Sequence, residues 1–69
     1  MAKFKNLEAE MVRYGIKIED IAEELTVSSN TARRKLNGEI GITIEEAKRV
    51  QKLLKKKNAE FTIDFLFSE

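Results

Sequence analysis

The 69 residues, 42% apolar and 36% charged, predict one small domain with a hydrophobic core and are too apolar for a disordered tail. Cysteine and histidine are both absent, which excludes disulfides, Ser–His or Cys–His nucleophile pairs, and zinc held by these residues. We expect no enzyme activity, metal, cofactor or small-molecule ligand. The sequence has no apolar run of the roughly 18 residues that span a membrane and no signal-peptide pattern, so we expect a cytoplasmic protein.

The net charge is only +1, but the charges are unevenly distributed. Residues 33–57 include nine basic and three acidic side chains, whereas residues 8–24 include six acidic and two basic ones. This asymmetry is typical of a protein with one face suited to a polyanion. Two amphipathic helices that merely differ in charge would give the same pattern, and the distribution alone does not separate these two interpretations.

Apolar residues three and four positions apart predict two helices in the first part of the chain. The first is expected over about 5–14 with Gly15 as its C-terminal cap, and the second over 18–25. The apolar faces are expected to be Leu7, Met11 and Tyr14 in the first helix, and Ile18, Ile21, Ala22 and Leu25 in the second. Acidic residues in the first turn of the second helix suit the positive end of its dipole.

A third helix is expected after a short turn at residues 26–28. Either Ser28 or Ser29 is suited to cap it, because a serine hydroxyl accepts hydrogen bonds from the free amides of the first turn. Ala32 and Leu36 form its narrow buried stripe, and the helix is expected to run to Asn37 and to stop at Gly38.

The spacing of Thr43 and Glu46 is that of a capping box and predicts the start of a fourth helix. We expect this helix to end near Asn58, since asparagine tolerates the left-handed conformation. Its inner face is expected to carry Ile44, Ala47, Val50, Leu53 and Leu54.

The aromatic tail at residues 61–67 alternates in the way a strand does, but a single strand has no partner here. We therefore favour a short last helix with Thr62 as its cap. This helix would fold Ile63, Leu66 and Phe67 onto the bundle. The aromatic residues of the tail could complete the core or form a dimer surface, and core completion is the expectation for so small a domain.

The outward face of the third helix carries side chains suited to reading DNA. On a helical wheel Asn30 and Arg34 lie opposite the buried stripe, with Arg33 and Asn37 beside them. Asparagine can bond bidentately to adenine and arginine to guanine, and hydroxyls at the helix start are suited to phosphates or bases. A helix face that contacts only solvent normally carries acidic as well as basic side chains. Residues 27–36 contain no acidic residue. The candidate residues on this segment are Ser28, Ser29, Asn30, Thr31, Arg33, Arg34 and Asn37.

Residues 15–38, GIKIEDIAEELTVSSNTARRKLNG, resemble the helix-turn-helix of the phage-repressor and Cro-like (XRE) family. The matching positions are Gly15, Ile16, Glu19, Asp20, Ile21, Ala22, Leu25, Val27, Ser28, Thr31, Leu36, Asn37 and Gly38. The end of the chain, IDFLF, is similar to the family's final short helix, and KLNG at 35–38 is similar to small phage regulators. The resemblance implies a single all-α domain over residues 1–69 with four or five helices. Its helix-turn-helix would span about 17–37, with the helix at about 29–37 in the major groove.

The family reads bases from positions that correspond here to Ser29, Asn30, Arg33 and Arg34. Three positions depart from its pattern. Ile18 stands where many members use a polar residue on a phosphate, so we expect that contact from Lys17. Thr26 replaces the usual glycine, and because a β-branched residue is strained in the left-handed region we expect the turn to differ locally. Lys35 occupies a position that is often apolar in the family, so we expect Leu36 to anchor the third helix in the core.

The sequence thus predicts a sequence-specific transcriptional regulator of bacterial or phage type whose partner is double-stranded DNA. Two copies are expected to bind a pseudo-palindromic site, with half-sites about one turn apart. An alternative keeps the fold but makes the chain a protein-interaction module, such as an antirepressor or assembly partner, and a purely structural bundle ranks third. The lysines at 55–57 are interpreted as complements of a helix dipole and not as a DNA site.

Overall fold

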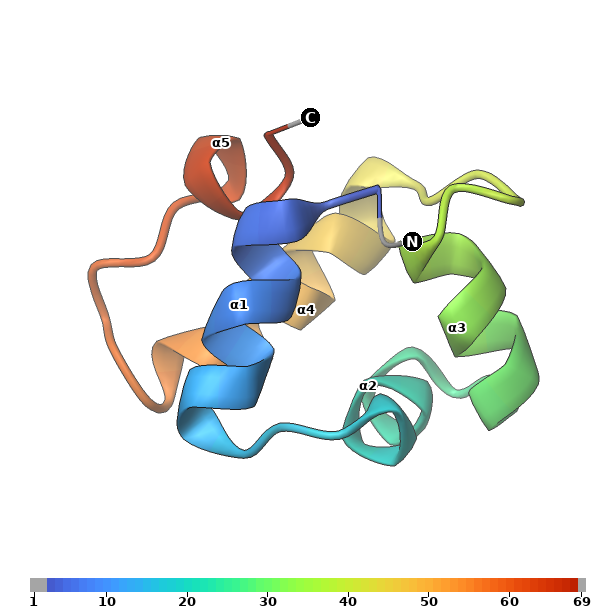
Figure 1. The fold of residues 1–69 in the computed structure, drawn as a ribbon, viewed down its shortest axis with the longest axis horizontal. Coiled ribbons are helices and arrows are strands. Elements are labelled where there is room, and N and C mark those ends of the chain that lie inside the picture. The colour runs from blue at the N-terminus through green and yellow to red at the C-terminus, as the bar shows by residue number, and fades with distance from the viewer. Residues whose placement is uncertain (1–2, 69) are drawn as a thin grey trace.

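The computed structural model describes residues 3–68, and within them it contains five helices and no strand (Figure 1). The helices are α1 (Lys5–Tyr14), α2 (Ile18–Leu25), α3 (Ser29–Leu36), α4 (Ile44–Lys55) and α5 (Ile63–Leu66). The predicted all-α fold is confirmed, as are the expected bounds of the first two helices. None of the helices in residues 3–68 combines the length and the apolar character needed to cross a membrane.

The core gathers side chains from all five helices. The largest fully buried side chains come from α1, α2, α4 and α5, and they are Leu7, Ile21, Val50, Leu54 and Leu66. α2 packs on both α3 and α4, while α5 packs on α1 and α4. Figure 1 shows α3 on the opposite side of the molecule from α5. α3 itself buries only Ala32 and Leu36, so most of its surface is left facing outward.

Three helices begin with the side-chain caps that the sequence predicts. Ser28 accepts a hydrogen bond from the Thr31 amide of α3, and Thr43 accepts one from the Glu46 amide of α4, each at 3.1 Å. Thr62 accepts one at 3.1 Å from the third residue of α5. A cap of this kind contributes about 1 kcal/mol, because it satisfies an amide that the helix leaves free. The choice between two serines is settled in favour of Ser28, since α3 begins at Ser29.

α1, α2 and α3 end in the same hydrogen-bonded turn, the Schellman motif. In each, a residue of positive φ follows the helix, and these residues are Gly15, Thr26 and Gly38. The amide of the next residue reaches back five positions; in α1 this bond runs from Ile16 to Met11 at 2.8 Å. In the first two connections, residues 15–17 and 26–28, this turn lets only three residues join successive helices, which keeps α2 and α3 close together.

Thr26 adopts φ 58° and ψ 45°, so the expectation that this turn would differ from the left-handed conformation is wrong. The Thr26 amide donates to Glu23 O at 3.2 Å, and the Val27 amide donates to Ala22 O at 3.0 Å. Val27 also packs against the core. These bonds and this packing hold a conformation that costs a non-glycine residue about 1–2 kcal/mol.

Two expectations for α4 are corrected. The helix ends at Lys55, not near Asn58, and Asn58 does not have a positive φ. The Asn58 side-chain oxygen instead accepts a hydrogen bond at 3.0 Å from the Glu60 amide in the following loop. Ile44 is not on the inner face, because its side chain is 70% exposed. It lies in the first turn, about 85° around the helix from the centre of the buried stripe, where no neighbouring helix covers it.

The tail forms the expected short helix and completes the core. Phe61 and Leu66 are buried, and Ile63 is half-buried. Phe67 packs edge-on against Phe4, with ring centroids 5.0 Å apart. Phe65 differs from its neighbours because it is 43% exposed while stacking on Phe61. The tail therefore serves mainly as core, with one aromatic ring left partly at the surface.

Candidate functional site

The surface of α3 presents the candidate side chains on the side away from the core. Asn30, Arg33 and Arg34 are exposed, while Ala32 and Leu36 on the opposite side are buried. Ser28 is exposed, and the half-buried candidates are Ser29, Thr31 and Asn37. α3 and its caps thus bring together seven of the eight candidate residues. The eighth, Lys17, is exposed and lies at the N-terminus of α2, where its amide donates to the Asp20 carboxylate at 2.9 Å.

The hydroxyls at the start of α3 are already engaged with each other. Ser28 Oγ accepts from the Thr31 amide and donates at 3.0 Å to Thr31 Oγ1. One hydroxyl proton is therefore used between the two side chains, and the other remains to donate to an anion.

Arg34 has an acidic neighbour that an inspection of α3 alone misses. Its Nε lies 3.8 Å from Oε1 of Glu39, and both side chains are exposed. Glu39 lies outside the acid-free stretch at 27–36, in the turn that follows α3. The Schellman turn at Gly38 returns Glu39 to the end of α3, where the Glu39 amide donates to Arg34 O at 2.9 Å. Exposed pairs of this kind are weak, so Arg34 is free to exchange this partner for a stronger one.

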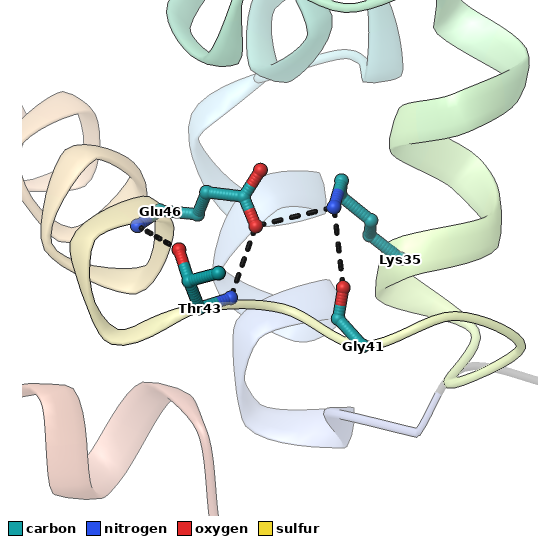
Figure 2. Close-up of polar contacts among 4 residues, drawn as sticks. All are labelled: Lys35, Gly41, Thr43 and Glu46. Atoms are coloured by element: carbon teal, nitrogen blue, oxygen red, sulfur yellow. Dashed lines mark hydrogen bonds and ion pairs between the residues drawn. The ribbon is translucent and has the colours of Figure 1, made fainter.

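Lys35, the third basic residue in a row, points in a different direction from Arg33 and Arg34. Figure 2 shows its ammonium directed at the loop before α4, where it donates to Gly41 O at 3.2 Å and to Glu46 Oε1 at 3.1 Å. The same carboxylate oxygen accepts from the Thr43 amide at 3.0 Å. The hydrogen bond from the Thr43 backbone holds the pKa of Glu46 below its usual value of 4.5, and Lys35 assists against the opposite effect of burial.

An apolar groove of about 310 Å³ runs beside α3 and was not predicted. Its floor is formed by core residues including Leu7, Met11 and Leu36, and its rim includes Arg33. Val12 of α1 lines it with a side chain that is 78% exposed. In the sequence, the one indication of this exposed apolar surface was Val12, an apolar residue that lies outside the buried stripe of its helix.

Residues 3–68 include no group of three or more acidic side chains arranged to hold a metal ion. Comparison of the chain with protein-family models, curated proteins and solved structures found no match. The resemblance to the phage-repressor and Cro-like family therefore stays a prediction that stands on the sequence motif.

Proposed function

We propose that this chain is a cytoplasmic, sequence-specific DNA-binding regulator of bacterial or phage type that places α3 in the major groove of double-stranded DNA. The observation that carries the proposal is the division of α3 into two sides. One side is anchored in the core by Ala32 and Leu36, and the other exposes Asn30, Arg33 and Arg34. An α-helix fits the major groove, where asparagine and arginine are the side chains best suited to adenine and guanine.

The connection between α2 and α3 supports this function. α2 and α3 pack against each other and are joined by only three residues, 26–28. In a helix-turn-helix the second helix reads bases while the first lies across the backbone. Lys17 at the start of α2 and Thr31 at the start of α3 supply donors for phosphates in that arrangement. Two copies docked on one duplex would place two α3 helices about one helical turn apart.

The decisive experiment is selection from a random double-stranded DNA library, followed by fluorescence anisotropy on the enriched duplex at two salt concentrations. We expect an enriched motif whose affinity falls with salt and stays well above that for random duplex. A palindromic motif would report two docked copies. Weak binding that is equal for all sequences, and that salt abolishes, would contradict the proposal.

A second candidate function, a protein-interaction module, is favoured by the groove beside α3. Exposed apolar surface next to a polar rim is typical of protein contacts. The variant Val12→Gln separates the two functions because it makes the groove more polar without placing an acid beside Arg33 on its rim. Retention of DNA selectivity in Val12→Gln would favour the DNA-binding function. Failure of the unaltered chain to enrich any motif would favour the interaction module.

A further inference from the structure

Lys35 belongs to the basic run on α3, but its side chain is largely covered by the protein. The side chain is 13% exposed, against 49% for its neighbour Arg34. Two protein oxygens accept from its Nζ: the Gly41 carbonyl at 3.2 Å and the Glu46 carboxylate at 3.1 Å (Figure 2). A phosphate would have to replace these partners. Lys35 is therefore placed as a structural cation.

The carboxylate that receives Lys35 is itself fixed. Glu46 is 21% exposed, and its Oε1 also accepts from the Thr43 amide at the start of α4. The Thr43 hydroxyl in turn accepts from the Glu46 amide, so both ends of the capping box are closed. A charge held in one geometry by a helix cap is a rigid acceptor, and without Lys35 only the Thr43 backbone and hydroxyl would offset its partial burial.

The position of this ion pair gives it a role in orienting α3. α3 packs chiefly on α2, whereas Glu46 belongs to α4. The Lys35–Glu46 pair thus joins the C-terminal half of α3 to α4, and the Gly41 bond joins it to the intervening loop. At the same end of α3 the Lys3 amide donates to Leu36 O at 3.2 Å. These contacts all lie at the C-terminal end of α3, away from the turn that joins it to α2.

We propose that Lys35 is a positioning residue that fixes the tilt of α3 through Glu46 and Gly41, and that it makes no contact with DNA. This inference rests on the proposed DNA-binding function, because the tilt matters for placing Asn30, Arg33 and Arg34 against base edges. Base reading requires side chains to be held within roughly 0.5 Å and 10–20° of the productive geometry. A residue that touches no base can therefore control selectivity.

The first test compares Lys35→Met with Lys56→Met, a matched loss of one positive charge at an exposed position. The probe is the duplex enriched by the unaltered chain, titrated at several salt concentrations. We expect Lys35→Met to lose about tenfold in affinity for this duplex, with an unchanged slope of log affinity against log salt. A slope that becomes shallower by about one would assign Lys35 to a phosphate and overturn the proposal. An affinity equal to that of Lys56→Met would overturn it as well.

A second variant, Lys35→Gln with Glu46→Gln, removes both charges and leaves neither buried alone. It is expected to recover part of the affinity lost in Lys35→Met, since two amides can still hydrogen-bond. Equal losses in the two variants, with α3 oriented in both as in the unaltered chain, would assign the loss to the charge of Lys35 at the DNA and contradict a positioning role.

Residual dipolar couplings of the free protein measure the orientation of α3 relative to α4 without DNA. We expect these couplings to change in Lys35→Met for α3 and to stay constant among α1, α4 and α5. Unchanged couplings in α3 would overturn the positioning role whatever the DNA result. Altered couplings in a chain that selects no duplex would uphold the positioning of α3 and reject the DNA-binding function, so the two failures are distinguishable.

Discussion

Arg34 and Glu39 face each other across the turn that ends α3, with Nε of the arginine 3.8 Å from Oε1 of the glutamate. The pairing follows from the backbone, because the left-handed Gly38 lets the Glu39 amide donate to Arg34 O at 2.9 Å. Arg34, one of the candidates for base reading, therefore has a weak acidic partner in the free protein. Binding to DNA would exchange this exposed carboxylate for a base edge, and two predictions depend on that exchange.

Arg34→Ala is expected to lose about 1–3 kcal/mol of binding free energy on the enriched duplex and to relax preference at one base position. The reason is the loss of a bidentate contact that distinguishes guanine from other bases. Anisotropy on the enriched duplex and on its single-base variants measures both effects. Lys56→Ala, at the exposed C-terminal cap of α4, is the control and should barely change the affinity. An equal loss on every duplex would make Arg34 a phosphate contact.

Glu39→Gln is expected to tighten DNA binding by about two- to fivefold, which corresponds to the 0.5–1 kcal/mol of an exposed ion pair. The change frees Arg34 and removes a negative charge near the phosphates. The gain should shrink at high salt, since both effects are screened. Anisotropy at low and high salt is the measurement. Unchanged affinity at low salt would mean that Glu39 lies too far from the duplex to matter.

Thr26→Gly is expected to raise the free energy of unfolding by about 0.5–1 kcal/mol. The native φ of 58° strains a β-branched residue and suits glycine, and part of the gain is offset by the greater freedom of glycine in the unfolded chain. Urea unfolding followed by circular dichroism measures the change. The same exchange in the first turn of α3, Thr31→Gly, is the comparison and should lower the free energy of unfolding, because it weakens helix propensity by a few tenths of a kcal/mol and removes the bond between the Thr31 and Ser28 hydroxyls. A loss of stability in Thr26→Gly would show that the threonine side chain stabilises the turn.

The stability difference between the unaltered chain and Glu46→Gln is expected to depend on pH. The pKa of Glu46 is lowered in the folded protein, so the ionised carboxylate stabilises the fold at pH values above its unfolded pKa, near 4.5. The stabilisation is lost as the pH falls through the lowered folded pKa. Urea unfolding of both proteins at pH 7, 5, 4 and 3 should show a constant difference at the two higher values and a shrinking one below. A difference that persists undiminished at pH 3 would contradict this role of the carboxylate.

Local signals in the sequence predicted most of the helix ends. Ser28, Thr43 and Thr62 cap helices because a hydroxyl before a helix satisfies amides one turn away, and this depends on neighbours in the chain alone. The end of α4 was misplaced for a complementary reason. Asparagine tolerates a left-handed conformation, but Asn58 does not adopt it. Its side-chain oxygen instead accepts a hydrogen bond from the Glu60 amide.

From the amino-acid order we could predict the all-α fold, the apolar stripes of α1 to α3 and the exposure of Asn30, Arg33 and Arg34, because these follow from a period of 3.6 residues and from local capping. Tertiary packing sets what lies next to each face. It turned Lys35 inward to Glu46, eleven residues away, brought Glu39 back to Arg34, and left Ile44 uncovered. Periodicity gives the direction of a side chain about its own helix axis, whereas the partner found in that direction depends on how separate helices pack.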